Sequence, residues 1–205
     1  MLDIKKALRH LRRVDQRFAM LIDQHGPADI SKSRNYFRSL ATAIIYQQLS
    51  GKAAATIHGR FVTLFTGGRF PKPTDVLDVP HETLRGVGLS NQKARYLHDL
   101  ALKFEDGTIR SRQLAHLSNE EVADVLMQVK GIGQWSADMF LVFGLGRPDV
   151  LPVGDLGIRK GFQQFFRLEA LPEADEMFGL AEPWRPYRTV ASWYMWRVAD
   201  TVTPK

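Results

Sequence analysis

Apolar residues recur at helical spacing along almost the whole of this 205-residue chain, and this pattern limits the folds open to it. The first apolar stripe consists of Ile4, Leu8, Leu11, Val14, Phe18 and Leu21. His25-Gly26-Pro27 then interrupts the pattern, as expected where a helix ends. No segment alternates apolar and polar residues as a half-buried strand would. The sequence therefore predicts an all-α fold.

Caps and breakers define the other expected helices. Their ranges are 36–49, 52–65, 74–79, 81–85, 90–102, 134–143, 155 or 156 to 166, and 186–199. A further helix follows Ser118, which can form a capping box with Glu121 because each side chain can bond the other's backbone amide. Thr74 is expected to cap its own helix, and Pro186 to occupy the first turn of the last one.

A turn with two glycines joins the helix after Ser118 to the next one. It reads Val129-Lys130-Gly131-Ile132-Gly133-Gln134-Trp135. Gly131 and Gly133 leave backbone N–H groups uncovered near a helix start, where such donors favour an anion. Glycines end many helices, but here a capped helix precedes the turn and another helix follows at once. We interpret the turn as a site for the DNA backbone. The similar segment 85–90 is explained better by a C-cap glycine, Gly86 or Gly88.

The charge of the chain agrees with a polyanionic partner without requiring one. Lysine and arginine number 28 against 22 aspartates and glutamates, which gives a formal net charge of +6. Such a surface attracts phosphates. A basic protein with no nucleic-acid partner would have the same composition, so charge alone leaves both classes open.

The absence of cysteine excludes several kinds of site. The chain cannot form disulfides, a thiolate zinc site or a cysteine-ligated iron–sulfur cluster. Leu2-Asp3-Ile4-Lys5-Lys6 lacks the apolar segment of a signal peptide, and no apolar run reaches membrane-spanning length. We expect an intracellular protein, cytoplasmic and nucleoid-associated in a bacterium or nuclear in a eukaryote.

Four sequence blocks, in this order, resemble one protein family. They are Tyr46-Gln47-Gln48-Leu49-Ser50 with Lys52-Ala53-Ala54, then 126–139, then 149–157, and finally 184–188 continuing to Trp196-Arg197. The chain resembles the helix-hairpin-helix (HhH-GPD) DNA glycosylases of base-excision repair, of the 3-methyladenine DNA glycosylase II type. The resemblance covers the chain from about Tyr36 onward.

The resemblance implies two helical lobes in one compact unit, with the active-site cleft between them. Residues 35–150 would form a helical-barrel lobe that contains the hairpin, and residues 1–34 with 151–205 the second lobe. Some relatives carry an additional N-terminal β-sheet domain, for which we expect no room here. The partner would be double-stranded DNA containing damaged bases, bound by a monomer and with no membrane involved.

Within the resemblance, Asp155 matches the catalytic aspartate. Cleavage of a base–sugar bond gives the sugar oxocarbenium character, which a carboxylate stabilises while it can also orient water. An alkylated purine is already cationic and leaves readily, so one carboxylate suffices. From its position alone, Asp155 would be an N-cap of the following helix. The two roles are compatible, because a cap fixes the direction of the carboxylate and favours its ionised form.

The position of Trp135 separates two mechanisms of the family. Glycosylases that also cleave the DNA backbone carry a lysine there, whose amine forms a Schiff base with the sugar. Neither Lys130 nor Lys93 matches that position. We therefore expect a monofunctional enzyme that uses water and lacks lyase activity.

Aromatic and loop residues complete the implied site. Trp135 and Trp196 match the pocket for the extruded base, where an indole face attracts a cationic ring, although buried packing would explain tryptophans equally. Trp184, Tyr187 and Trp193 are expected to pack in the core. Gln48, with Leu49 beside it, matches the wedge that fills the gap in the DNA stack; its alternative is the end of a helix before Ser50.

Other residues would contact the DNA backbone or an ion. The backbone-binding set consists of Lys130, Gly131, Gly133 and Gln134. The family often holds sodium or potassium at the hairpin, here at the backbone carbonyls of Met127, Val129 and Ile132, and no other metal or cofactor is required. Met139 departs from the aromatic residue that some members place in the pocket, which leaves the lesion range open.

The function expected from the resemblance is hydrolytic removal of alkylated purines, such as 3-methyladenine or 7-methylguanine, from duplex DNA to leave an abasic site. Two alternatives stay open at the level of sequence. One is a glycosylase for deaminated or oxidised bases. The other is a noncatalytic helix-hairpin-helix protein that recognises DNA structure.

Overall fold

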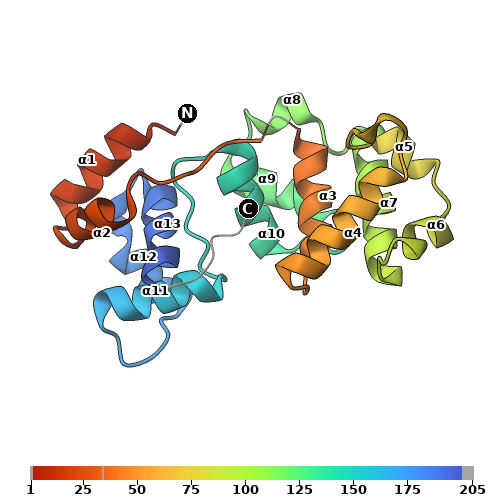
Figure 1. Ribbon diagram of the computed structural model, residues 1–205. Helices are drawn as coiled ribbons and strands as arrows, with labels where there is room; N and C mark the ends of the chain where they lie inside the picture. Colours follow the sequence, from red (N-terminus) through yellow and green to blue (C-terminus); the bar gives the residue numbers. More distant parts are fainter. Residues whose placement is uncertain (1, 34, 200–205) are drawn as a thin grey trace. The chain divides into compact units, whose positions relative to one another are not determined.

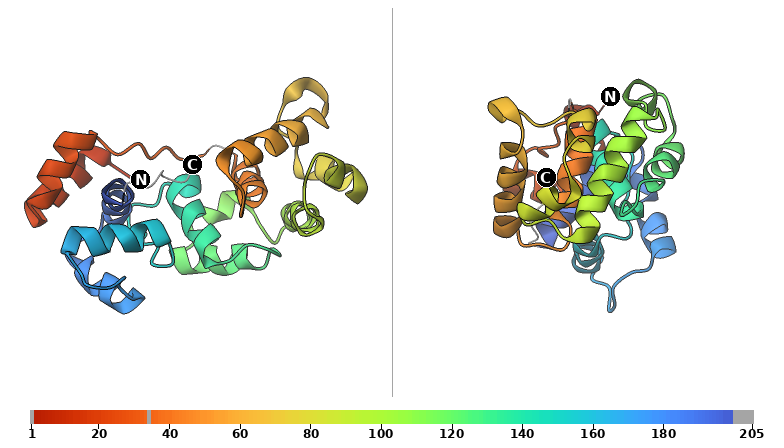
Figure 2. Two further views of the ribbon diagram at one scale, coloured as in Figure 1. Left: turned by 60° about the horizontal axis from the view of Figure 1, so that its bottom comes forward. Right: turned by 90° about the vertical axis from the view of Figure 1, so that its right-hand side faces the viewer.

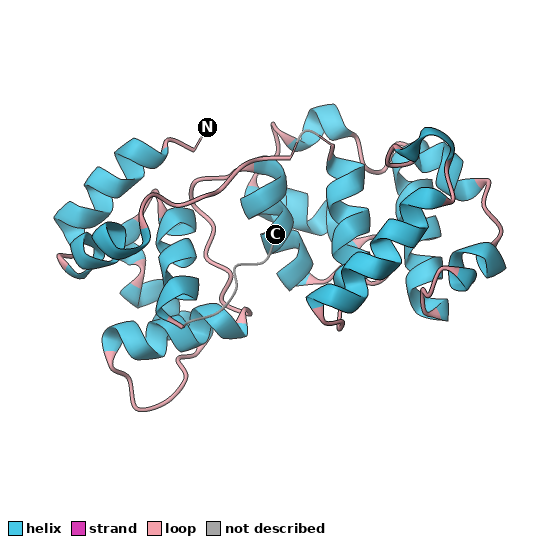
Figure 3. Ribbon diagram, viewed as in Figure 1, coloured by secondary structure: helices cyan, strands magenta, loops and turns pink. Residues whose placement is uncertain are grey.

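The computed structural model describes residues 2–33 and 35–199, and within them it contains helices and no strand (Figure 3). The prediction of an all-α fold is confirmed. The chain divides into two compact units, one of Met1–Lys32 with Leu141–Lys205 and the other of Ser33–Phe140. No helix among the described residues is long and apolar enough to cross a membrane.

The first unit combines the N-terminal helices with the helices that follow residue 141. They are α1 (Ile4–Val14), α2 (Arg17–His25), α11 (Leu156–Phe166), α12 (Ala174–Leu180), the short η3 (Glu182–Trp184) and α13 (Arg188–Val198) (Figure 1). α11 and α13 pack closely because Gly161 has no side chain; a Cβ there would collide with the Met195 carbonyl oxygen. The rings of Phe18, Phe162 and Trp184 meet in the core. This packing fixes α11, which begins directly after Asp155.

The second unit contains the helices between residues 36 and 139. They are α3 (Tyr36–Tyr46), α4 (Gly51–Thr63), the short η1 (Thr66–Gly68), α5 (Pro73–Leu77), α6 (His81–Gly86), α7 (Asn91–Glu105), α8 (Ser111–Leu114), α9 (Asn119–Met127) and α10 (Gln134–Met139). The long α7, yellow-green in Figures 1 and 2, packs against α3 and α5. Its buried face carries Ala94, Leu97, Leu100 and Ala101. α7 is therefore central to this unit and can position the loops around it.

Two of the predicted caps are confirmed. Ser118 Oγ accepts a hydrogen bond from Glu121 N at 3.1 Å, and a Glu121 carboxylate oxygen accepts one from Ser118 N at 2.7 Å, which completes the capping box at the start of α9. Gly26, at φ 72°, ends α2 as expected. Strong local signals of this kind can be interpreted correctly without tertiary information.

Apolar spacing alone misplaces two helix boundaries. The segment 4–25 is two helices, because Asp15 is extended (φ −154°) and its carboxylate binds the Arg17 guanidinium at 2.9 Å. α3 ends at Tyr46, three residues before the predicted end, because Gln47 leaves the helical region at ψ 132°. The apolar pattern continues across both breaks and therefore does not reveal them.

The remaining corrections concern helix starts and short helices. Thr74 is not a cap: α5 begins at Pro73, and the Asp75 carboxylate accepts a hydrogen bond from Lys72 N at 2.8 Å. The short α8 and α12 were not predicted, because few periodic positions fit in four or seven residues.

The start of α13 and the end of α10 also differ from the prediction. α13 begins at Arg188 and not at Pro186, since Tyr187 before it is not helical (φ −121°, ψ 31°). α10 ends at Met139, and the predicted range 134–143 continues as a π-helical segment, η2 (Phe140–Leu145).

Candidate active site and nucleic-acid interface

Asp155 is buried at the N-terminus of α11, where its carboxylate serves as the N-cap. Its Oδ1 accepts hydrogen bonds from Ile158 N at 2.9 Å and from Trp196 Nε1 at 2.8 Å. The capping role considered from the sequence is confirmed. Because two donors from different helices hold one oxygen, the direction of the carboxylate is fixed. Such preorganisation is what stabilisation of a developing cation requires.

Trp196 contributes a contact that the sequence did not suggest. It lies on α13, is 1% exposed, and stacks on Phe143 with ring centroids 5.9 Å apart and planes at 23°. Its indole N–H points to Asp155. The expected role of Trp196 in a base pocket stays a prediction, while the structure places it as a neighbour of the candidate catalytic carboxylate.

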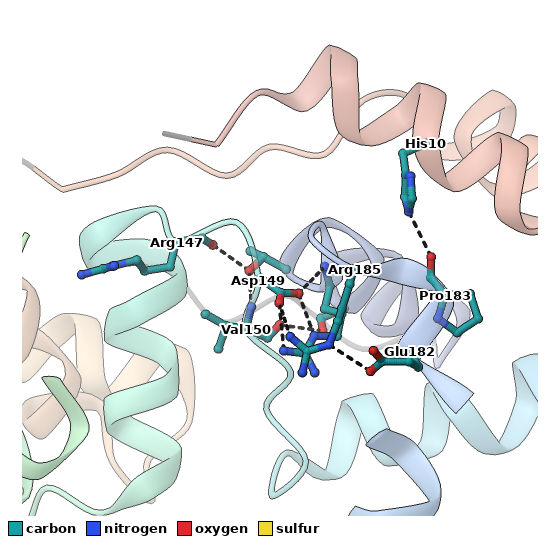
Figure 4. A network of polar contacts seen from close by, with 10 residues as sticks. His10, Arg147, Asp149, Val150, Glu182, Pro183 and Arg185 are labelled. Atoms are coloured by element: carbon teal, nitrogen blue, oxygen red, sulfur yellow. Dashed lines mark hydrogen bonds and ion pairs between the residues drawn. The ribbon is translucent and has the colours of Figure 1, made fainter. Parts of the chain in front are cut away.

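The segment that leads to Asp155 is anchored by an ion cluster around Asp149 (Figure 4). The Asp149 carboxylate accepts hydrogen bonds from Arg188 Nε at 2.7 Å, Arg188 Nη2 at 3.0 Å and Arg185 Nη1 at 2.9 Å. Arg185 also binds Glu182 at 2.9 Å. The Arg188 side chain is only 8% exposed. The cluster therefore holds the residues before Asp155 against the start of α13.

Backbone contacts continue this anchoring along the same segment. Thr189 Oγ1 donates to the Arg147 carbonyl at 2.7 Å and accepts from Val150 N at 2.9 Å. Asp155 N donates to the Pro152 carbonyl at 3.0 Å. Sequence reasoning missed the contacts between residues 147–150 and 185–189 because these residues are about 40 positions apart in sequence and only tertiary packing brings them together.

The hairpin joins α9 to α10 in the second unit. Gly131 has φ 83°, and a Cβ there would collide with the Tyr96 ring, so only glycine fits. Gly133 has φ −109°, and a methyl group added to it would meet nothing within 4 Å. Both glycines are exposed, while Val129 and Ile132 are buried. The turn thus presents its glycines to solvent while its apolar residues fix it to the unit.

Two polar groups of the predicted backbone-binding set have partners within the protein. The amide of Lys130 donates to Asp99 Oδ2 at 2.8 Å, and the Gln134 side-chain amide donates to Asp138 Oδ1 at 2.8 Å. Lys130 and Gln134 are both exposed residues. The turn is therefore held from both sides.

Asp138 is a buried carboxyl that sequence reasoning did not single out. It is 8% exposed on α10, and burial raises its pKa to about 6, although the hydrogen bond from Gln134 acts in the opposite direction. A pKa higher in the folded than in the unfolded chain means that folding favours the protonated form. The free energy by which the protonated Asp138 carboxyl stabilises the fold is fully present below about pH 4 and is lost as the pH rises through about 6.

Replacement of Asp138 by asparagine should remove this loss. The asparagine side chain keeps an oxygen that accepts from Gln134. We expect Asp138→Asn to raise the free energy of unfolding at pH 7.5 by up to about 3 kcal/mol, since the pKa of Asp138 is raised by about two units and one unit corresponds to about 1.4 kcal/mol. At pH 4 we expect no gain. Urea unfolding of both proteins at the two pH values measures this; an equal effect at both, or the same effect from Asp124→Asn at an exposed site, would contradict it.

The other predicted contact residues differ in exposure. Trp135 is 40% exposed and Leu49 39%, whereas Met139 is buried at 7%. Gln48 is exposed and has φ 54°, a left-handed conformation that is uncommon for a residue other than glycine. Trp184 and Trp193 are buried, as expected for packing residues.

The Lys93 side chain is hydrogen-bonded to the backbone at the C-terminal end of α3. Its Nζ donates to the carbonyls of Ile45 at 2.8 Å and Gln47 at 2.6 Å, and burial lowers its pKa. These contacts are consistent with the expectation that Lys93 is not the nucleophile. They also give it a structural task that the sequence did not indicate.

Comparisons with known proteins identify the family. The description "HhH-GPD superfamily base excision DNA repair protein" matches residues 41–186. The chain belongs to this superfamily. Its relatives include DNA-3-methyladenine glycosylase 1 of Schizosaccharomyces pombe, which is 35% identical over 208 residues, 98% of this chain and 91% of the relative. A putative DNA-3-methyladenine glycosylase of Bacillus subtilis is 30% identical over 92% of this chain and 69% of its own length.

Solved structures agree with this assignment. The S. pombe 3-methyladenine DNA glycosylase in complex with abasic DNA has a TM-score of 0.83 and 34% identity, covering 98% of this chain and all of that chain (100%). A DNA-3-methyladenine glycosidase from Bacillus halodurans has a TM-score of 0.84 and 35% identity, covering 95% and 89%. The fold is thus that of solved 3-methyladenine DNA glycosylases.

Proposed function

We propose that this protein is a DNA glycosylase of base-excision repair that hydrolyses the N-glycosidic bond of alkylated purines in duplex DNA and leaves an abasic site. The substrates are of the 3-methyladenine and 7-methylguanine type. The observation that carries the proposal is the buried carboxylate of Asp155, held by Ile158 N and Trp196 Nε1. Relatives that span almost the whole chain are named 3-methyladenine glycosylases.

In the proposed reaction, Asp155 stabilises the positive charge that develops on the sugar as the base departs, and orients the attacking water. The alkylated base carries a positive charge before the reaction and leaves as a neutral molecule. No protein acid is needed to protonate it. One fixed carboxylate therefore supplies the chemistry that this substrate class requires.

The proposal includes no lyase step. Trp135 occupies the position at which lyase-active members carry the nucleophilic lysine, and an indole cannot form a Schiff base. Lys93 binds two backbone carbonyls. Water is the nucleophile, and the DNA strand stays intact at the abasic site. In the same proposal Trp135, which is 40% exposed, contacts the extruded base.

The second unit would hold the DNA. Gly131, Gly133 and the side chains of Lys130 and Gln134 contact the backbone, while Gln48 and Leu49 enter the stack. A sodium or potassium ion bound to the carbonyls of Met127, Val129 and Ile132 would add a positive charge facing phosphate. The carbonyl of Val129 already accepts from Ile132 N at 3.1 Å, and its second lone pair suits such an ion. Since the substrate is genomic DNA, the protein would act in the nucleoid or the nucleus.

A panel of duplex oligonucleotides tests the proposed substrate class. Each carries one lesion: 7-methylguanine, uracil, hypoxanthine or 8-oxoguanine. We expect base release from the alkylated duplex and at least about a hundredfold slower release from the others, equivalent to about 2.7 kcal/mol. Release chiefly of a deaminated or oxidised base would reassign the lesion class. Tight binding without any release would identify a noncatalytic DNA-structure-binding protein.

Gly133 allows the backbone-binding role to be tested separately from folding. A methyl group at Gly133 meets nothing within 4 Å and its φ suits alanine, so Gly133→Ala should fold normally. It would still obstruct a phosphate that approaches the turn. We expect about tenfold weaker binding to damaged and undamaged duplexes alike, because phosphate contacts carry no base information.

Fluorescence anisotropy with both duplexes measures this effect. Gly179→Ala, also without a neighbour within 4 Å but on α12, is the matched control and should bind as the wild type does. A loss confined to one lesion would contradict the assigned role of the turn.

A further inference from the structure

The loop between α3 and α4, residues 47–50, holds a strained conformation. Gln48 adopts φ 54°, which costs of the order of 1 kcal/mol for a side chain of this kind. Both Gln48 and Leu49 are exposed. Such a conformation persists only when neighbouring contacts hold it, and Lys93 and Gln47 contribute such contacts.

Lys93 of α7 is hydrogen-bonded to the backbone at the start of this loop. Its Nζ donates to the carbonyls of Ile45 and Gln47, which lie where α3 ends and its own hydrogen bonds run out. A cation at this end of a helix also interacts favourably with the aligned peptide dipoles. The backbone on the N-terminal side of Gln48 is therefore fixed to α7.

Gln47 connects the same loop to the hairpin turn. Its side-chain Nε2 donates to the Gly131 carbonyl at 2.9 Å and lies 3.5 Å from Ser136 Oγ. Gly131 is in the turn, and Ser136 is buried in the first turn of α10. The residue directly before Gln48 thus contacts both sides of the glycine turn, 84 residues away in sequence.

α7 supports the hairpin as well as the loop. Tyr96 packs its ring against Gly131, and Asp99 Oδ2 accepts a hydrogen bond from Lys130 N. Lys93, Tyr96 and Asp99 are spaced three residues apart and lie along one side of the helix. One helix therefore fixes the relative position of the exposed Gln48 and of the glycine turn, and Gln47 joins the two directly.

We propose that Gln47 is a positioning residue for extrusion of the damaged base. This inference rests on the proposed glycosylase function. Unstacking a base costs a few kcal/mol, and the wedge must resist that load while the turn holds the backbone. The hydrogen bond from the Gln47 amide to Gly131 connects the loop 47–50, which carries Gln48, to the glycine turn. Gln48 is therefore held in place relative to the turn when it enters the DNA stack. Without this hydrogen bond the loop moves more easily, and the state with the base extruded becomes less populated.

Two substitutions remove the hydrogen bond from Gln47 to Gly131 and keep a side chain of similar size. Gln47→Met keeps the length of the side chain and has no N–H donor. Gln47→Glu keeps the shape but presents only acceptors to the Gly131 carbonyl at pH 7.5. In single-turnover assays, we expect both to release 7-methylguanine from a fully paired duplex about tenfold or more slowly, equivalent to about 1.4 kcal/mol. With the same lesion in an unpaired bulge, where extrusion costs little, the deficit should fall below about threefold.

A second measurement separates this inference from the proposed chemistry. 2-Aminopurine, placed next to an abasic-site analogue in duplex DNA, fluoresces more strongly when its stacking is disrupted. The wild type should brighten it on binding, and Gln47→Met should brighten it less at saturating protein, whether or not any base is released. Lys93→Met, which frees the Ile45 and Gln47 carbonyls, should show the same paired-against-bulged difference as Gln47→Met.

Equal deficits on paired and bulged lesions, or full brightening by Gln47→Met, would overturn the positioning role. Brightening by the wild type without base release from any lesion would instead refute the proposed glycosylase activity and leave the mechanical role of Gln47 standing. Circular dichroism and thermal unfolding of each variant identify a variant that does not fold. Gln113→Met, on the exposed face of α8 in the same unit, is the matched control and should behave as the wild type in both assays.

Discussion

Asp155→Asn should lower the rate of base release by about 10²–10³-fold, the loss of about 2.7–4 kcal/mol found when one preorganised electrostatic contact to a transition state is removed. The substitution removes the charge and keeps the shape. An asparagine oxygen can still accept from Ile158 N and Trp196 Nε1, so α11 should stay capped. We therefore expect the melting temperature and the affinity for abasic-site DNA to stay close to those of the wild type.

Single-turnover release of 7-methylguanine from a defined duplex measures this effect. Asp3→Asn is the matched control, because Asp3 is also an N-cap aspartate whose side chain accepts a backbone amide, in this case at the start of α1. It should leave the rate unchanged. An Asp155→Asn variant that folds, binds DNA and releases base at the rate of the wild type would remove Asp155 from the mechanism.

Trp196→Phe should lower the rate by about tenfold or more, since a hydrogen bond to a charged group contributes about 1.5–3 kcal/mol. The phenyl ring keeps an aromatic surface against Phe143 but has no N–H for Asp155. The carboxylate then loses a donor that fixes Oδ1. The loss should be in kcat, with little change in KM, because the affected interaction is made in the transition state.

A double-mutant cycle distinguishes positioning from substrate contact. If Trp196 acts through Asp155, Trp196→Phe should cost little further in the Asp155→Asn background. Trp184→Phe removes a buried indole from the core of the same unit, and should lower stability but not kcat. An unchanged kcat together with a changed preference among lesions would show that Trp196 acts on the base and not on Asp155.

The sequence predicts those features that depend on local residue patterns. The helical period gave the fold class, and the Ser118–Glu121 box and the Asp155 cap follow from residues three positions apart. The break at Asp15 is invisible to this reasoning because the apolar stripe continues through it. Local rules therefore give the correct elements and misplace some of their ends.

Several interactions that organise the candidate site are long-range. Trp196 and Asp155 are separated by 41 residues, and Gln47 and Gly131 by 84. Nothing in the residue types indicates these pairs, because glutamine and tryptophan have many possible partners. The family resemblance pointed to Asp155 and Gln48, whereas the residues that hold them in place became visible only in the folded chain.

The proposed function is tested most directly by the products formed from methylated DNA. Duplex DNA treated with a methylating agent is incubated with the wild-type protein, and the released bases are separated by chromatography. We expect free 3-methyladenine and 7-methylguanine, with strands that break only after alkali treatment of the abasic sites. Absence of free methylated bases, from protein that is folded and binds the DNA, would contradict the proposal.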